Sequence, residues 1–131
     1  RVSACTDVTG FGLMGHLLEM IAGGDERPGD ERVDVEIDVN NIPFLAGALA
    51  AAASGTFSSL QSENVRSKRA VRNHAEAAAA APARYPLTYD PQTSGGLLIA
   101  LRPGDAGRFL DALREAGAGY DAAAVIGRAV P

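Results

Sequence analysis

The sequence is short of several residue types that would mark particular classes of protein. Its 131 residues include no tryptophan, one cysteine and one lysine, and aromatic residues make up only 5%. A single cysteine excludes an internal disulfide framework and fits a reducing cytoplasm. No apolar run approaches the length of a membrane span, and no signal peptide is visible. The net charge of −4 argues against a nucleic-acid binder.

The length and the apolar content predict one domain with a sizeable core. Hydrophobic residues make up 47% of the chain, and 131 residues are enough to bury many of them. The chain begins at Arg1 rather than at a methionine, and its first motif follows within a few residues. We therefore expect it to be a piece of a longer protein.

The first motif, Ala4 to His16, places a carboxylate and a hydroxyl before a glycine-rich helix start. Asp7 precedes Thr9 by two residues, and Thr9 is a suitable helix N-cap. Apolar residues then recur at near-helical spacing and predict a helix that ends at Gly23 and Gly24. These apolar residues are Phe11, Met14, Leu17, Leu18 and Ile21, and the glycines of the helix start are Gly10, Gly12 and Gly15.

This helix start has two interpretations. Its small residues and free N–H groups favour an anion close to the backbone. The carboxylate of Asp7 would repel that anion unless Asp7 holds a divalent cation that bridges to phosphate oxygens, as Mg²⁺ commonly does. Alternatively, the motif is only a capped turn, and its glycines let the helix pack close to a neighbour. The spacing alone leaves both open.

The middle of the chain predicts a strand and two helices. A polar loop over 25–32 leads to Val33–Val39, which alternates apolar and acidic residues and predicts a strand. Its carboxylates, at positions 34, 36 and 38, suit a solvated face better than a metal site. Alanine-rich residues 42–53 predict a helix, and 62–81 predict another with Ser62 as its cap. In the latter, three arginines three residues apart could face one anionic ligand or form a solvated face; they are Arg66, Arg69 and Arg72.

A second polar motif, Asp90 to Gly96, lies between a predicted extended segment, Tyr85–Tyr89, and a predicted buried strand, Leu97–Leu101. Its hydroxyls and flexible glycines suit a turn, and loops at the mouth of a buried strand are common ligand positions. Residues 103–116 then predict a helix, and 122–130 a last strand. The alternation predicts an α/β domain in which helices cover a mixed sheet.

The two motifs together resemble the C-terminal domain of selenophosphate synthetase (selenide, water dikinase). The residues that carry the resemblance are Thr6-Asp-Val-Thr-Gly-Phe-Gly-Leu-Met-Gly-His16, Asp90-Pro-Gln-Thr-Ser-Gly-Gly-Leu-Leu98 and the closing Val125-Ile-Gly127. The resemblance implies a three-layer α/β domain, helix/mixed sheet/helix, with partial similarity to a ferredoxin-like arrangement. It also implies an N-terminal ATP-binding domain, absent here, through which two subunits dimerise.

The family's reaction converts ATP, selenide and water to selenophosphate, phosphate and AMP, in a cleft between the two domains that holds Mg²⁺. By motif, Asp7 matches the family's metal-binding aspartate of this half. The same resemblance implies cleft-lining roles for Thr9, Gly10, Thr93, Ser94, Gly95 and Gly96. The catalytic cysteine (or selenocysteine) and lysine belong to the absent half, so this chain alone should have no turnover. We expect Cys5 to be a buried apolar side chain and His16 to make a local polar contact.

Two other functional classes stay open. One is another ATP-dependent kinase or synthetase of the same superfamily, which includes aminoimidazole ribonucleotide synthetase and thiamine-monophosphate kinase. The other is a non-catalytic anion-binding or regulatory module. The chain also departs from one familiar family pattern, because Thr56–Asn64 stands where many relatives carry Pro-Gly-Gly-Thr. Asn64 is a candidate to substitute locally for that run.

Overall fold

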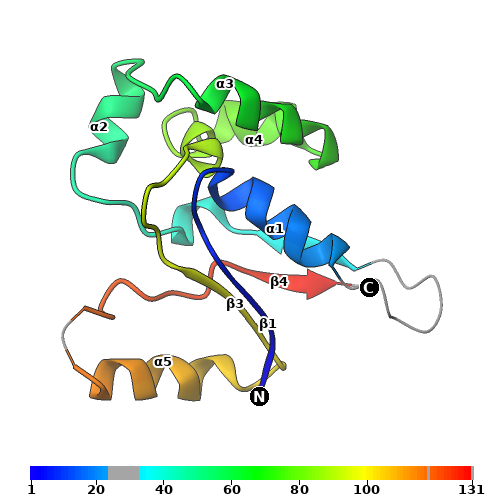
Figure 1. Ribbon diagram of the computed structural model, residues 1–131, viewed down its shortest axis with the longest axis vertical. Coiled ribbons are helices and arrows are strands. Elements are labelled where there is room, and N and C mark those ends of the chain that lie inside the picture. The colour runs from blue at the N-terminus through cyan, green and yellow to red at the C-terminus, as the bar shows by residue number, and fades with distance from the viewer. Residues whose placement is uncertain (24–32, 118, 131) are drawn as a thin grey trace.

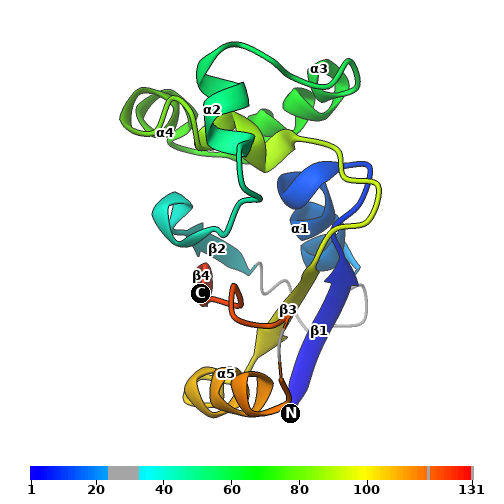
Figure 2. The same ribbon diagram turned by 90° about the vertical axis from the view of Figure 1, so that its left-hand side faces the viewer.

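A computed structural model describes residues 1–23, 33–117 and 119–130 of the chain, as an α/β arrangement (Figure 1). The elements follow in the order β1 (Val2–Asp7), α1 (Gly12–Ala22), β2 (Asp34–Ile37), η1 (Val39–Asn41), α2 (Ala48–Ala53), α3 (Gln61–Asn64), η2 (Val65–Ala70), α4 (His74–Ala80), η3 (Tyr85–Tyr89), β3 (Leu97–Leu101), α5 (Ala106–Glu115) and β4 (Gly127–Val130), where η denotes a 3₁₀ helix. Helices α2, α3 and α4 lie at one end and α5 at the other, with the strands between them (Figures 1 and 2). This order confirms the predicted α/β class. The predicted loop over 25–32 falls outside the described residues.

The described strands form two antiparallel pairs, where the sequence predicted one mixed sheet. Strand β1 pairs with β3, and β2 pairs with β4. Each pair joins segments roughly 90 residues apart, and the alternation of a strand does not specify its partner. No helix in the part of the chain that the structure describes is long and apolar enough to cross a membrane.

The core lies where α1 meets η3 and α4. Met14, Tyr85 and Tyr89 form its buried cluster, against small apolar side chains that include Ala77 and Ala78 of α4. The Tyr85 hydroxyl lies 2.9 Å from Nδ1 of His74 and 2.6 Å from the Tyr89 hydroxyl. Burial, and then the hydrogen bond with Tyr85, raises the pKa of Tyr89 far above its usual value of 10. The aromatic core is therefore also a chain of hydroxyl hydrogen bonds that fixes η3.

Segment 85–89 was predicted to be extended, and that prediction is wrong. The segment is a 3₁₀ helix with a proline in its first turn, and the Thr88 hydroxyl donates to the Tyr85 carbonyl at 2.7 Å. The rings of Tyr85 and Tyr89 pack edge to face, at 5.4 Å between centroids. Tertiary packing of these rings therefore overrides the extended preference before Pro86.

Several predicted boundaries also change. The helix predicted over 62–81 divides into α3, η2 and α4, with the backbone extended at Val71, where Arg72 reaches across to pair with Asp34. The N-cap of α3 is Leu60 rather than Ser62. The helix predicted over 42–53 spans only 48–53, and the strands predicted over 33–39 and 122–130 span only 34–37 and 127–130. Strand β1 was not predicted. Helices α1 and α5 and the bounds of strand β3 are confirmed. The prediction that β3 is a buried strand is wrong, because only Leu98 of it is buried and β1 is its one partner among the described strands.

Candidate functional site

Asp7 ends strand β1 with an exposed side chain, at the point where the two polar motifs meet. Its cross-strand partner is Leu97, the first residue of β3, and Leu97 is 66% exposed. The residues just before Leu97 are the glycine-containing turn of the second motif, so the antiparallel pairing places this turn beside the residues that follow Asp7. The structure thus brings together the two stretches that the sequence indicated separately.

Backbone hydrogen bonds hold the two motifs in contact. The Val8 N–H donates to the Gly96 carbonyl at 2.9 Å, and the Gln92 N–H donates to the Thr9 carbonyl at 3.0 Å. A Cβ added at Gly95 would overlap the Val8 carbonyl oxygen, so only glycine lets the backbones approach this closely. The predicted cleft residues Gly10, Thr93, Ser94, Gly95 and Gly96 are all exposed around this junction.

The predicted N-cap role of Thr9 is wrong. The N-cap position of α1 is Phe11. The Thr9 hydroxyl instead lies 3.0 Å from Nε2 of His16, whose Nδ1 lies 3.0 Å from a Glu19 carboxylate oxygen. His16 is only 7% exposed, and it makes the local polar contact that we expected. Because its hydroxyl is engaged, Thr9 contributes to the junction through its backbone carbonyl.

The glycines at the start of α1 differ in their surroundings. Gly12 has φ of +70°, and a Cβ there would lie 2.8 Å from the Tyr89 carbonyl carbon, so close packing explains this glycine. A Cβ at Gly10 would meet no described atom within 4 Å. The packing interpretation therefore accounts for Gly12, and no close contact with the described atoms explains Gly10.

The metal chemistry of the site depends on one carboxylate. The described residues contain no group of three or more His, Cys, Asp or Glu side chains that could hold a metal ion. Mg²⁺ is typically bound by one or two carboxylates, several waters and substrate phosphates, rather than by an all-protein cage. An exposed single carboxylate therefore fits a shared site for Mg²⁺, and it does not fit a closed structural site.

Cys5 is exposed, so the prediction of a buried side chain is wrong. Residues two apart on a strand share a face, and Cys5 therefore lies on the same face of β1 as Asp7. That face includes the cross-strand partners Leu97 and Ile99. The error has a simple cause, since the sequence gives no indication that this segment is a strand or that one of its faces lies open.

Ion pairs and hydrogen bonds with the backbone engage the side chains of the other charged rows. Of the arginine row, Arg66 pairs with Glu63 at 2.8 Å and Arg72 pairs with Asp34, which supports the solvated interpretation. Of the acidic row, Glu36 pairs with Arg128 at 2.7 Å, and Asp38 accepts from the Asn40 N–H at 2.9 Å. A shallow hollow of about 440 Å³ remains among three basic side chains, those of Arg66, Lys68 and Arg69.

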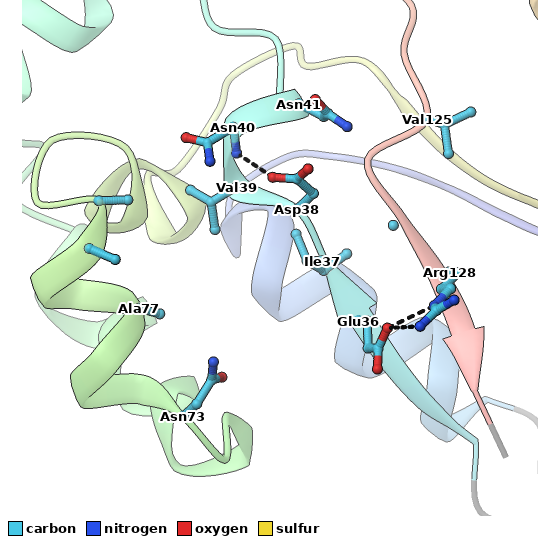
Figure 3. Close-up of a pocket in the computed structure, with 13 residues that line it drawn as sticks. Glu36, Ile37, Asp38, Val39, Asn40, Asn41, Asn73, Ala77, Val125 and Arg128 are labelled. Atoms are coloured by element: carbon cyan, nitrogen blue, oxygen red, sulfur yellow. Dashed lines mark hydrogen bonds and ion pairs between the residues drawn. The ribbon is translucent and has the colours of Figure 1, made fainter.

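A larger groove, of about 610 Å³, lies between α4 and the β2–β4 pair (Figure 3). Small apolar residues of α4 line one wall, and β2 with η1 lines the other. None of the predicted site residues belongs to its lining, which comprises Glu36, Ile37, Asp38, Val39, Asn40, Asn41, Asn73, Ala77, Ala80, Ala81, Val125, Gly127 and Arg128. The groove is therefore separate from the junction at Asp7.

Two polar side chains at the junction carry contacts that sequence patterns did not indicate. The Asn64 side-chain amide donates to the carbonyls of Gly10 and Tyr89, at 2.9 and 3.0 Å. The Gln92 side chain donates to the Asp90 carboxylate at 2.9 Å. Neither residue belongs to a periodic pattern. The sequence indicated these residues only by their position. Gln92 lies inside the second motif, and Asn64 is the last residue of Thr56–Asn64, the stretch that differs from the family pattern.

Comparison with known proteins defines the class of this chain. The profile described as AIR synthase related protein, C-terminal domain, matches residues 1–131, and the chain belongs to this family.

Its curated relatives are named selenide, water dikinase, which confirms the resemblance seen in the two motifs. The chain is 38% identical over 117 residues to the protein from Geobacter metallireducens, covering 89% of this chain and 31% of that protein. It is 38% identical over 130 residues to that from Pelobacter propionicus, covering 98% and 34%, and 35% identical over 132 residues to that from Aliarcobacter butzleri, covering 100% and 34%. The chain thus spans about a third of the length of the relatives it matches.

Proposed function

We propose that these 131 residues are the C-terminal domain of a cytoplasmic, ATP-dependent selenide, water dikinase. This phosphotransferase makes selenophosphate, phosphate and AMP from selenide, ATP and water. The names of the curated relatives support the reaction, and the family match supports the place of the chain in a longer enzyme. The single observation that carries the site is the exposed Asp7 carboxylate at the junction of both motifs.

Asp7 would supply one carboxylate to the Mg²⁺ that accompanies the nucleotide. When bound, Mg²⁺ neutralises charge on the phosphates and orients them for transfer. The chain's own residues then have three roles around it. Asp7 fixes the position of the cation, the exposed Thr93 and Ser94 offer hydroxyls to phosphate oxygens, and Gly10 and Gly96 leave room for the ligand beside the backbone.

The remaining parts of the active site come from an N-terminal ATP-binding domain, which also forms the homodimer. We propose that this domain packs against the face that carries Asp7. Two large apolar side chains are exposed on or near that junction, Leu97 at 66% and Phe11 at 55%. Because the nucleophile and most nucleotide contacts lie in the other domain, the chain alone has no turnover. An assay of AMP release from ATP and selenide tests this directly, since activity of the separate chain would refute it.

The test of the metal role uses the complete enzyme that contains this chain. Asp7→Asn keeps the shape of the side chain and removes its charge. We expect a loss of at least about 100-fold in the rate of AMP release at saturating ATP, since even outer-shell changes at metal sites cost about 10- to 100-fold. The control is Asp111→Asn on α5, whose carboxylate is 68% exposed and pairs only with Arg114 among the described residues. Equal activity of the two variants would exclude Asp7 as a ligand.

The substrate is tested on the same complete enzyme. Phosphate and AMP release are compared with selenide, with an aminoimidazole ribonucleotide precursor and with thiamine monophosphate as the acceptor. Release that depends on selenide supports the proposal. Release that depends on either of the other compounds assigns the chain to another kinase or synthetase of the superfamily, and no release with any of them favours a non-catalytic module.

A further inference from the structure

We propose that Asn64 is a positioning residue for the site at Asp7. Its side-chain NH₂ group donates to the Gly10 carbonyl at 2.9 Å and to the Tyr89 carbonyl at 3.0 Å. These two carbonyls belong to the chain segments that carry the two motifs, 54 and 25 residues away from Asn64. This inference deepens the proposed function and rests on it.

The geometry assigns the amide without ambiguity. An asparagine NH₂ group has two hydrogens to donate, and both acceptors here are carbonyl oxygens that can only accept. Both hydrogens are therefore used, and a flipped amide would place an oxygen against two oxygens. One half-buried side chain thus fastens the turn after Asp7 to the residue that precedes Asp90.

The turn at Gly10 needs such a fastening. Gly10 is exposed, and glycine restricts its own backbone less than any other residue. On one side of Gly10, the Thr9 carbonyl accepts from the Gly12 and Gln92 N–H groups, both at 3.0 Å. Asn64 adds the bond that holds the Gly10 carbonyl itself. A ligand site on a turn retains its geometry only when the supporting contacts are made before the ligand binds.

Asn64 is itself held firmly. It is the last residue of α3, and its own carbonyl accepts the Ser67 hydroxyl at 2.6 Å. One helical turn earlier, the buried Gln61 donates its side-chain amide to the Pro86 carbonyl at 2.7 Å. Both amides thus attach α3 to η3, but of the two only Asn64 also bonds the turn at Gly10. Gln61 is therefore a matched control, with the same helix, the same partner segment and no hydrogen bond to the candidate site.

The experiment compares Asn64→Ala, Asn64→Asp and Gln61→Ala in the complete enzyme. Asn64→Asp keeps the side-chain size and removes both donors. For the two Asn64 variants we expect kcat to fall about 10-fold or more, and the Mg²⁺ concentration for half-maximal rate to rise, as for other supporting residues of metal sites. Gln61→Ala should stay within about 2-fold of wild type at a comparable loss of thermal stability, because it removes one bond outside the site.

A second readout does not depend on activity. Hydrogen–deuterium exchange of the Gly12 and Gln92 amides should accelerate in both Asn64 variants and stay unchanged in Gln61→Ala. If all three variants behave alike in kinetics and exchange, Asn64 is an ordinary structural contact and the inference is overturned. If Asp7→Asn is fully active, the proposed function fails whatever Asn64 does. If Asp7→Asn is inactive while the Asn64 variants match Gln61→Ala, only the positioning role fails.

Discussion

Gly95→Ala tests whether the contact between the two motifs depends on the absence of a side chain. The added Cβ would overlap the Val8 carbonyl oxygen and lie 3.1 Å from the Val8 carbonyl carbon and 3.4 Å from Cβ of Gln92. Even a weak C–H···O contact needs about 3.3 Å, so the two backbones would have to separate by about 1 Å. Gly95 lies outside the left-handed region of backbone conformation, so the effect is steric overlap alone.

The cost follows from what the separation disrupts. Overpacking a tightly fitted position costs about 1–3 kcal/mol. Separating Val8 from the turn also weakens the Val8–Gly96 and Gln92–Thr9 hydrogen bonds, each with a net contribution of about 1 kcal/mol. Together these effects give a loss of about 3 kcal/mol in the free energy of unfolding. With a urea m-value of about 1.5 kcal/mol/M, the unfolding midpoint would fall by about 2 M.

The neighbouring glycine provides the control. A Cβ at Gly96 would meet nothing within 4 Å among the described atoms, and Gly96 also lies outside the left-handed region. Gly96→Ala should therefore be neutral or stabilising by about 0.4–1 kcal/mol, through the restricted unfolded chain. Urea unfolding followed by far-ultraviolet circular dichroism measures both variants. Equal midpoints for Gly95→Ala and Gly96→Ala would refute the close approach of the motifs.

Three further predictions concern stability, and urea unfolding checks each. Gly12→Ala should lower the free energy of unfolding more than Gly55→Ala. Both glycines have positive φ, but only at Gly12 would the added Cβ meet described backbone, at 2.8 Å. Tyr85→Phe should lower the free energy of unfolding by about 1–3 kcal/mol, because it leaves the hydroxyl of Tyr89, a residue only 1% exposed, without its partner. Tyr89→Phe should lower it by about 1 kcal/mol, since Tyr85 keeps its contact with His74, and equal losses would contradict this order of hydrogen bonds. Hydrogen bonds from Arg108 and then from Arg102 lower the pKa of Asp105 below 3.8. Their stabilisation is present above that pH and is lost as pH falls through the lowered pKa, so Asp105→Asn should be destabilised near neutral pH and match wild type in stronger acid.

The elements that the sequence predicted correctly are those whose pattern is local. Helix α5 has a clear apolar stripe, and β3 is a short apolar run between turn residues. Strand β1 was missed because Val2-Ser-Ala-Cys-Thr-Asp7 mixes small and polar residues, and its strand conformation depends on pairing with a segment about 90 residues later. Long-range pairing of this kind leaves little trace in a local pattern.

Local pattern can also predict too much regular structure, as it does over 61–80, where the structure has α3, η2 and α4 in place of one helix. Alanine and arginine favour a continuous helix there. The chain nevertheless extends at Val71, and the side chains on either side of it have distant partners: Asn64 bonds Gly10 and Arg72 bonds Asp34. Contacts at both ends of the segment therefore decide its shape, and local helix propensity does not.

For the candidate site, the sequence indicated the two motifs and missed the manner of their contact. Motif order could place Asp7 near the turn at Ser94, because both motifs pointed to one cleft. It could not show that the approach depends on backbone bonds at Val8 and Gln92, or that His16 engages the Thr9 hydroxyl. These contacts come from pairing geometry, which the identity of the side chains does not encode.

The pairing of Asp7 with Leu97 has an energetic consequence for any surface that covers this face. Covering Leu97 would gain about 2 kcal/mol from buried apolar area, because two thirds of it is exposed. The same surface would remove water from the adjacent carboxylate, and burying an unpaired carboxylate costs several kcal/mol. The apolar gain alone therefore does not offset the loss, and the covering surface must bring a positive charge to Asp7. In the proposed enzyme Mg²⁺ supplies that charge, so closure of the second domain over this face and binding of Mg²⁺ to Asp7 should strengthen each other.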